Sequence, residues 1–185
     1  MRITKRTSGF TLIELLIVMA MVAVMMTLAV PGLRQLLANQ QLSAAASDLQ
    51  AAAMQARSTA LKFNCRTFVK PLDGTWANGY RIYVQRTIPP VTSPPTEPVC
   101  EASGDTTILT QEALPTSVII TKVNGVNNYF AYEGSGFLAN DVSGSANATW
   151  KITASGTDRV RCLIMERSGR ARVHDPRPAT TCPTS

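Results

Sequence analysis

A short basic leader followed by a long apolar run constrains this chain more than any other feature. Arg2, Lys5 and Arg6 precede Gly9, and the 21 residues of 10–30 contain a single ionisable side chain. A helix rises about 1.5 Å per residue, so this run would be roughly 31 Å long, close to the thickness of a bilayer core. The run therefore predicts a membrane-spanning helix over residues 10–30.

The one charge in this helix is the carboxylate of Glu14. Such a group costs about 2.5–3.5 kcal/mol on an insertion scale, so we expect it to have a cationic partner. An ordinary secretory signal is cut after an apolar region of about 7–15 residues. Here the polar break comes before the run, so the run is expected to stay on the mature chain. A plain single-pass anchor with an incidental glutamate is the alternative.

This segment resembles the class III signal of type IV pilins and pseudopilins. The matching residues are Gly9, Phe10, Thr11, Leu12, Glu14 and Pro31. The resemblance implies that a prepilin peptidase cuts between Gly9 and Phe10, removing the leader 1–9, and that the new amine is methylated. It also implies that the protein resides in the inner membrane with a periplasmic domain and then enters a cell-surface pilus, at or near its tip. There, Glu14 would pair with the amine of Phe10 on a neighbouring subunit.

The apolar pattern continues past Pro31 at helical spacing and is rich in alanine, which favours a helix. We expect one helix from about Thr11 to Lys62, kinked near Pro31 where a backbone donor is missing. Its second half, residues 31–62, is amphipathic and should dock its apolar stripe on a globular domain of residues 63–185.

Short alternating segments after Phe63 predict an antiparallel β-sheet, so the fold class is α+β. Asn124-Gly125 predicts a hairpin. Residues 87–98 hold five of the eleven prolines and predict an extended surface loop, and residues 174–185 predict an irregular tail. Strands are expected at 65–70, 79–86, 106–111, 117–123, 128–133, 148–153 and 159–167. A pilin fold is what the resemblance implies for this arrangement.

The four cysteines are Cys65, Cys100, Cys162 and Cys182. An even number in an exported domain favours two disulfides, with three pairings open. We prefer Cys65–Cys100 and Cys162–Cys182, because each closes a long irregular stretch. A zinc site is the rival reading, but there is no C-x-x-C pair and His174 is the only histidine. We therefore expect no metal and no other cofactor, and, without a credible nucleophile–base arrangement, no enzyme activity.

Positive charge is concentrated near the C-terminus. The segment 159–177 contains six arginines and only two acidic residues, Glu166 and Asp175, which gives it a net charge of +4. Arg170 and Arg172 are two apart, so on a strand they would share a face about 6.5–7 Å apart, similar to successive phosphates of a nucleic-acid strand. Guanidinium groups bind phosphate oxygens in bidentate fashion. A solvated strand face is the alternative.

The late Gly-Arg-Ala-Arg of residues 169–172 and the pilin-type N-terminus are similar to the FimT/GspH branch of minor pilins and pseudopilins. The resemblance implies that Gly169, Arg170 and Arg172 bind extracellular DNA during natural transformation, with Arg167 and Arg177 as accessory contacts. It also implies other major and minor pilins as partners. The alternative is a structural pseudopilin that primes pilus or type II secretion assembly without binding DNA. An adhesive role for the 87–98 loop is a third reading.

Four aromatic residues offer rings that stack on bases in other proteins. In a strand-rich domain such residues more often belong to the core, and we assign them there. They are Trp76, Tyr80, Tyr129 and Trp150.

Overall fold

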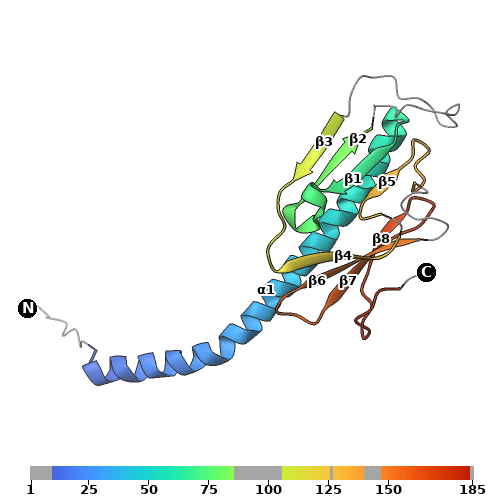
Figure 1. Ribbon diagram of the computed structural model, residues 1–185. Coiled ribbons are helices and arrows are strands. Elements are labelled where there is room, and N and C mark those ends of the chain that lie inside the picture. Colours follow the sequence, from blue (N-terminus) through green and yellow to red (C-terminus); the bar gives the residue numbers. More distant parts are fainter. Residues whose placement is uncertain (1–9, 86–105, 126, 140–146, 184–185) are drawn as a thin grey trace, which may run out of the picture. The chain divides into compact units, whose positions relative to one another are not determined.

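The computed structural model describes residues 10–85, 106–125, 127–139 and 147–183 (Figure 1). These residues fall into two units, divided between Leu37 and Ala38. The leader with Gly9, the proline-rich loop 87–98 and Cys100 lie outside the described residues, so the expectations for them stay predictions.

Helix α1 (Leu12–Phe63) matches the predicted helix to within one residue at each end. Thr11 caps its N-terminus. The backbone amide of Glu14 donates to Thr11 Oγ1 and the amide of Thr11 donates to Glu14 Oε2, both at 3.3 Å, which forms a capping box. At the other end Asn64 has a φ of 51°, and the amide of Cys65 donates to the carbonyl of Ala60 at 3.1 Å. This is the Schellman pattern of helix termination.

In the first unit, every side chain described between Phe10 and Leu37 is exposed. Among the described residues, no helix taken singly has the length and apolarity needed to cross a membrane. Two pieces of the helix, bent by 41° to each other, pass the test when they are taken together, on length and composition alone. They are Leu12–Thr27 and Gly32–Phe63.

The second unit contains two antiparallel four-stranded sheets rather than the single sheet expected from the sequence. The first has the order β3-β2-β1-β5, and the second has the order β4-β6-β7-β8. Short 3₁₀ turns, η1 (Leu72–Gly74) and η2 (Trp76–Asn78), join β1 to β2. The strands are β1 (Thr67–Pro71), β2 (Tyr80–Val84), β3 (Thr106–Gln111), β4 (Val118–Asn124), β5 (Phe130–Tyr132), β6 (Ala148–Ala154), β7 (Val160–Met165) and β8 (Ala171–His174). The α+β class is confirmed.

The hairpin predicted at Asn124-Gly125 is wrong. Strand β4 pairs with β6, whereas β5 pairs with β1 in the other sheet. Burial explains the difference, because Phe130 is fully buried in β5, stacked on Trp76 at 5.9 Å and edge-on to Trp150 at 5.3 Å. The chain after Asn124 crosses from one sheet to the other, which places these rings in a shared core.

One hydrophobic core joins α1 to both sheets. On the helix it is built from two leucines and several alanines, whose small side chains allow the strands to approach closely. Fully burying each leucine contributes about 1.5–3 kcal/mol. Trp76, Tyr80 and Trp150 are at most 2 % exposed and Tyr129 is partly buried against the core, which confirms their assignment. The helix residues with no more than 1 % exposure are Leu42, Ala46, Leu49, Ala53, Ala56 and Ala60.

The tail after β8 is attached to β7 by a disulfide between Cys162 and Cys182, the pairing preferred from the sequence, with a Cα–Cα distance of 5.7 Å. Val160 and Ile164 complete a small second core with these two cysteines. Cys65 is also disulfide-bonded. The tail therefore covers the face of β7 that points away from the main core.

Candidate nucleic-acid interface

The β7–β8 hairpin carries the Gly-Arg-Ala-Arg segment. Its loop, residues 167–169, is closed by two backbone hydrogen bonds of 2.9 Å, from the amide of Gly169 to the carbonyl of Glu166 and from the amide of Glu166 to the carbonyl of Arg170. Gly169 has a φ of 84°, the left-handed region that glycine enters without steric cost. A left-handed glycine at the end of a three-residue loop is usual in hairpins. Ser168-Gly169 therefore forms part of the tight turn that joins β7 to β8.

Arg170 and Arg172 extend from the same face of this hairpin. Arg172 pairs in register with Ile164, while Ala171 and Val173 pack on the main core from the opposite face. Arg172 Nε lies 3.4 Å from Glu166 Oε1, and both side chains stay partly exposed. Arg170 is exposed and has no ion pair or side-chain hydrogen bond within the described residues. Its charge is thus available to an external anion.

The two predicted accessory arginines lie at different places. Arg167 is exposed in the hairpin loop, the same loop that ends at Gly169. Arg177 lies beyond the open end of the hairpin, where its Nε and Nη2 contact Asp175 Oδ2 at 2.8 and 2.7 Å. Arg161 Nη1 lies 2.6 Å from the same oxygen. The hydrogen bond from Arg177, with the charges of both arginines, holds the pKa of Asp175 below its usual range.

Sequence reasoning missed a further arginine that reaches the hairpin, Arg57 of α1. Its Nη2 donates to the carbonyl oxygen of Ser168 at 3.0 Å. Seven residues earlier on the helix, the Gln50 side-chain amide donates to the carbonyl of Ala171 at 3.3 Å. Both contacts attach the arginine-bearing hairpin to the helix. The spacing of residues 50, 54, 57 and 61 marks one helix face, but nothing in the sequence indicates which strand lies against it.

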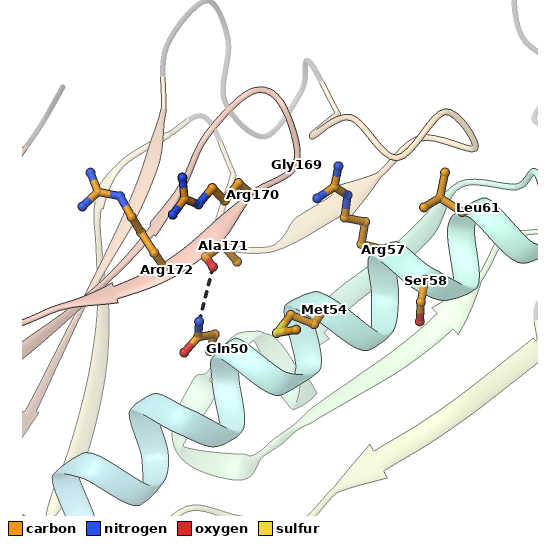
Figure 2. Close-up of a pocket in the computed structure, with 9 residues that line it drawn as sticks. All are labelled: Gln50, Met54, Arg57, Ser58, Leu61, Gly169, Arg170, Ala171 and Arg172. Carbon is orange, nitrogen blue, oxygen red and sulfur yellow. Dashed lines mark hydrogen bonds between the residues drawn. The ribbon is translucent and has the colours of Figure 1, made fainter.

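A hollow of about 510 Å³ lies between this helix face and the hairpin. Gln50, Met54, Arg57 and Leu61 line it from α1, and residues 169–172 line it from the hairpin (Figure 2). Met54 is 61 % and Leu61 is 52 % exposed, so the helix side of the hollow presents apolar surface between cationic groups. Such a site suits a ligand with anionic and apolar parts.

The N-terminal residues predicted to act in processing and assembly, Phe10 and Glu14, are exposed in the first unit. Within the described residues, the carboxylate of Glu14 accepts hydrogen bonds from the backbone amide and from the hydroxyl of Thr11. Among the described residues, no cluster of histidine, cysteine, aspartate or glutamate has the arrangement of a metal site.

Two family profiles match the sequence. One, described as "Type II transport protein GspH", matches residues 45–169, about two thirds of the chain. This chain belongs to the GspH family. The other, the prokaryotic N-terminal methylation motif, matches residues 4–30. The GspH match includes the loop glycine, Gly169, and ends before Arg170 and Arg172, so it does not bear on those two side chains. No functionally curated protein matches the sequence.

One solved structure supports the pilin fold. The type IV minor pilin FimU of Pseudomonas aeruginosa is similar with a TM-score of 0.54 and 19% identity, over 80% of this chain and 96% of that one. The minor pseudopilin EpsH of the Vibrio cholerae type 2 secretion system has a TM-score of 0.48 and 13% identity, over 74% and 98% of the two chains. The family match and the N-terminal methylation motif together identify the chain as a minor pilin or pseudopilin of the GspH/FimT type.

Proposed function

We propose that this GspH-family protein is a minor type IV pilin that binds extracellular DNA through the β7–β8 hairpin during natural transformation. The N-terminal methylation motif supports a membrane-anchored helix with a periplasmic domain before assembly into the pilus. Prepilin peptidase and other pilins are then its processing and assembly partners. Gly169 shapes the loop, while Arg167, Arg170 and Arg172 supply the phosphate contacts.

The observation that carries the proposal is the exposure of Arg170, which has no counter-ion among the described residues, on a hairpin tethered to the helix. The backbone of Arg170 is held on one side by the hydrogen bond that its carbonyl accepts from the amide of Glu166, and on the other by the contact of Gln50 with Ala171. Arg170 and Arg172 share a face about 6.5–7 Å apart, which fits adjacent phosphates. A hairpin whose backbone is held in advance loses less freedom on binding than a flexible loop would.

Electrostatics sets the expected strength and character of this binding. Arg167, Arg170 and Arg172 against Glu166 give the hairpin a net charge of +2. Each duplex phosphate neutralised contributes about −0.9 to the slope of log affinity against log salt. With so few contacts a single domain binds weakly, without sequence preference and with marked salt sensitivity. Several copies along a fibre would supply avidity.

A second function is favoured by the family description, which is that of a type II transport protein. In this role the protein is a structural pseudopilin that primes or caps the pseudopilus, and its arginines contact acidic faces of partner pilins. Gene neighbourhood separates the two roles, because secretion-system neighbours favour the structural role and competence or pilus neighbours favour DNA uptake.

A titration of the second unit, residues 38–185, tests DNA binding directly, since this unit has its own core. A labelled 30-base-pair duplex would be titrated across a salt series with the parent, with Arg170→Gln/Arg172→Gln and with Arg159→Gln. Arg159 is exposed at the opposite end of β7 and serves as the control for lost charge. We expect the double variant to lower the salt slope by about 1.8 and the control to leave it unchanged. Equal binding by the double variant and the parent would refute the proposal.

A further inference from the structure

We infer that Arg57 of α1 is a further phosphate-binding residue, so that one phosphodiester group is held between the helix and the β7–β8 hairpin. This inference rests on the proposed function and deepens it. It extends the interface beyond Gly-Arg-Ala-Arg to a residue more than 100 positions earlier in the sequence.

The charge of Arg57 lacks a counter-ion within the described part of the chain. One of its N–H groups is bound to the carbonyl of Ser168, and its Nε is buried without a hydrogen-bond partner in that same part. The neighbouring Tyr132 is a neutral phenol whose pKa is raised by burial, an effect that the charge of Arg57 opposes. A partly buried guanidinium without a carboxylate is costly unless an anion from outside completes it.

Geometry brings Arg57 to the other arginines. A Cβ built on Gly169 would lie 3.0 Å from Arg57 Nε and 3.2 Å from its Cζ, so the guanidinium lies against the bare Cα of the loop glycine. Arg57, Arg170 and Arg172 line the same hollow. In Figure 2 the side chain of Arg57 rises from the helix toward Gly169, and the side chains of Arg170 and Arg172 extend from the hairpin.

The chemistry of the hollow fits a nucleic-acid backbone rather than a simple anion. Three guanidinium groups supply the donors for phosphate oxygens, and within the described ranges only that of Arg172 is paired with a carboxylate. Met54 and Leu61 supply apolar surface beside them, against which a deoxyribose can pack. In this arrangement the glycine of the loop lets the helix arginine reach the phosphate that Arg170 binds.

The first experiment uses the full-length protein in detergent micelles with the same labelled duplex and salt series. Arg57→Gln removes the charge and keeps a polar side chain, and Arg159→Gln is the control. We expect Arg57→Gln to weaken binding and to lower the salt slope by about 0.9, as Arg170→Gln alone does. A parental slope in Arg57→Gln overturns the inference. If Arg170→Gln also keeps the parental slope, the proposed function fails with it.

The second experiment needs no variant, so it stays decisive even where Arg57→Gln disturbs the fold. The full-length protein is modified with phenylglyoxal, with and without the duplex, and each arginine is quantified by mass spectrometry. At a duplex concentration that gives roughly 80 % occupancy, we expect the modification of Arg57 and Arg170 to fall about fivefold and that of Arg159 to stay unchanged. Protection of Arg170 without protection of Arg57 overturns the inference and leaves the proposed function standing.

Discussion

Gly169 lies directly against the carbonyl oxygen of Gly136, so closely that a Cβ at position 169 would collide with it. The contact connects the arginine hairpin to the chain that follows β5. A second contact nearby, from the amide of Leu138 to the carbonyl of Arg167 at 3.1 Å, runs between the same two segments. The glycine of Gly-Arg-Ala-Arg therefore has a packing role in addition to its role in the turn.

Replacement of this glycine is expected to be costly. Gly169→Ala would combine a left-handed conformation for an L-residue with overpacking against Gly136 and Arg57, so we expect a loss of about 2–4 kcal/mol in the free energy of unfolding. Gly74→Ala is the matched control, because Gly74 has a similar φ of 75° and nothing within 4 Å of its Cβ position. That control should lose about 1–2 kcal/mol. Urea denaturation of residues 38–185 measures both, and equal losses would contradict the packing role.

Acid should weaken the attachment of the C-terminal tail. The hydrogen bond from Arg177 and the charge of Arg161 lower the pKa of Asp175 in the folded protein. The unfolded value is about 3.9, so this contribution to stability is present above that pH and is lost as the pH falls through the lower folded pKa. Thermal unfolding between pH 2 and 6 should show a steeper acid loss for the parent than for Asp175→Asn. Asp158→Asn, which removes an exposed carboxylate, is the control, and parallel curves for parent and Asp175→Asn would speak against the linkage.

Glu14 has two roles, as a capping residue and as a charge, and two substitutions can separate them. Its carboxylate accepts a hydrogen bond from the amide of Thr11, and it is also the only charge in the apolar run. Glu14→Gln keeps a capping side chain and removes the charge, whereas Glu14→Ala removes both. If the charge pairs with the Phe10 amine of a neighbouring subunit, both variants should insert and be processed yet stay out of filaments. Immunoblots of sheared pili and membrane fractions report this, and normal incorporation of Glu14→Gln would leave the cap as the only role.

The helix and most strands could be predicted because their signals are local. The apolar run, the alanine-rich stripe after Pro31 and alternation in segments such as Tyr80–Val84 each follow from a few neighbouring residues. The pairing of strands was not local. Asn124-Gly125 has the composition of a hairpin turn, yet the burial of Phe130 between two tryptophans sends the next strand to the other sheet.

The candidate interface was predictable only where its signal, like that of the helix, lies in neighbouring residues. Arg170 and Arg172 share a face because they are two apart on a strand, which the sequence states directly. The ion pair of Arg172 with Glu166 follows from the closing of the loop, and that of Arg177 with Asp175 from the turn after β8. Arg57 could not be assigned, because its place beside Gly169 depends on how α1 packs against an edge strand far along the chain.

DNA uptake by living cells tests the central claim most directly. Cells whose chromosome carries Arg170→Gln/Arg172→Gln would be supplied with labelled duplex DNA beside the parent and an Arg159→Gln strain, after pilus yield has been matched by shearing. We expect the double variant to assemble pili normally and to lose at least about tenfold in uptake, which is the effect of roughly 1.4 kcal/mol of lost binding. Uptake at the parental level by normally piliated double-variant cells would contradict the account.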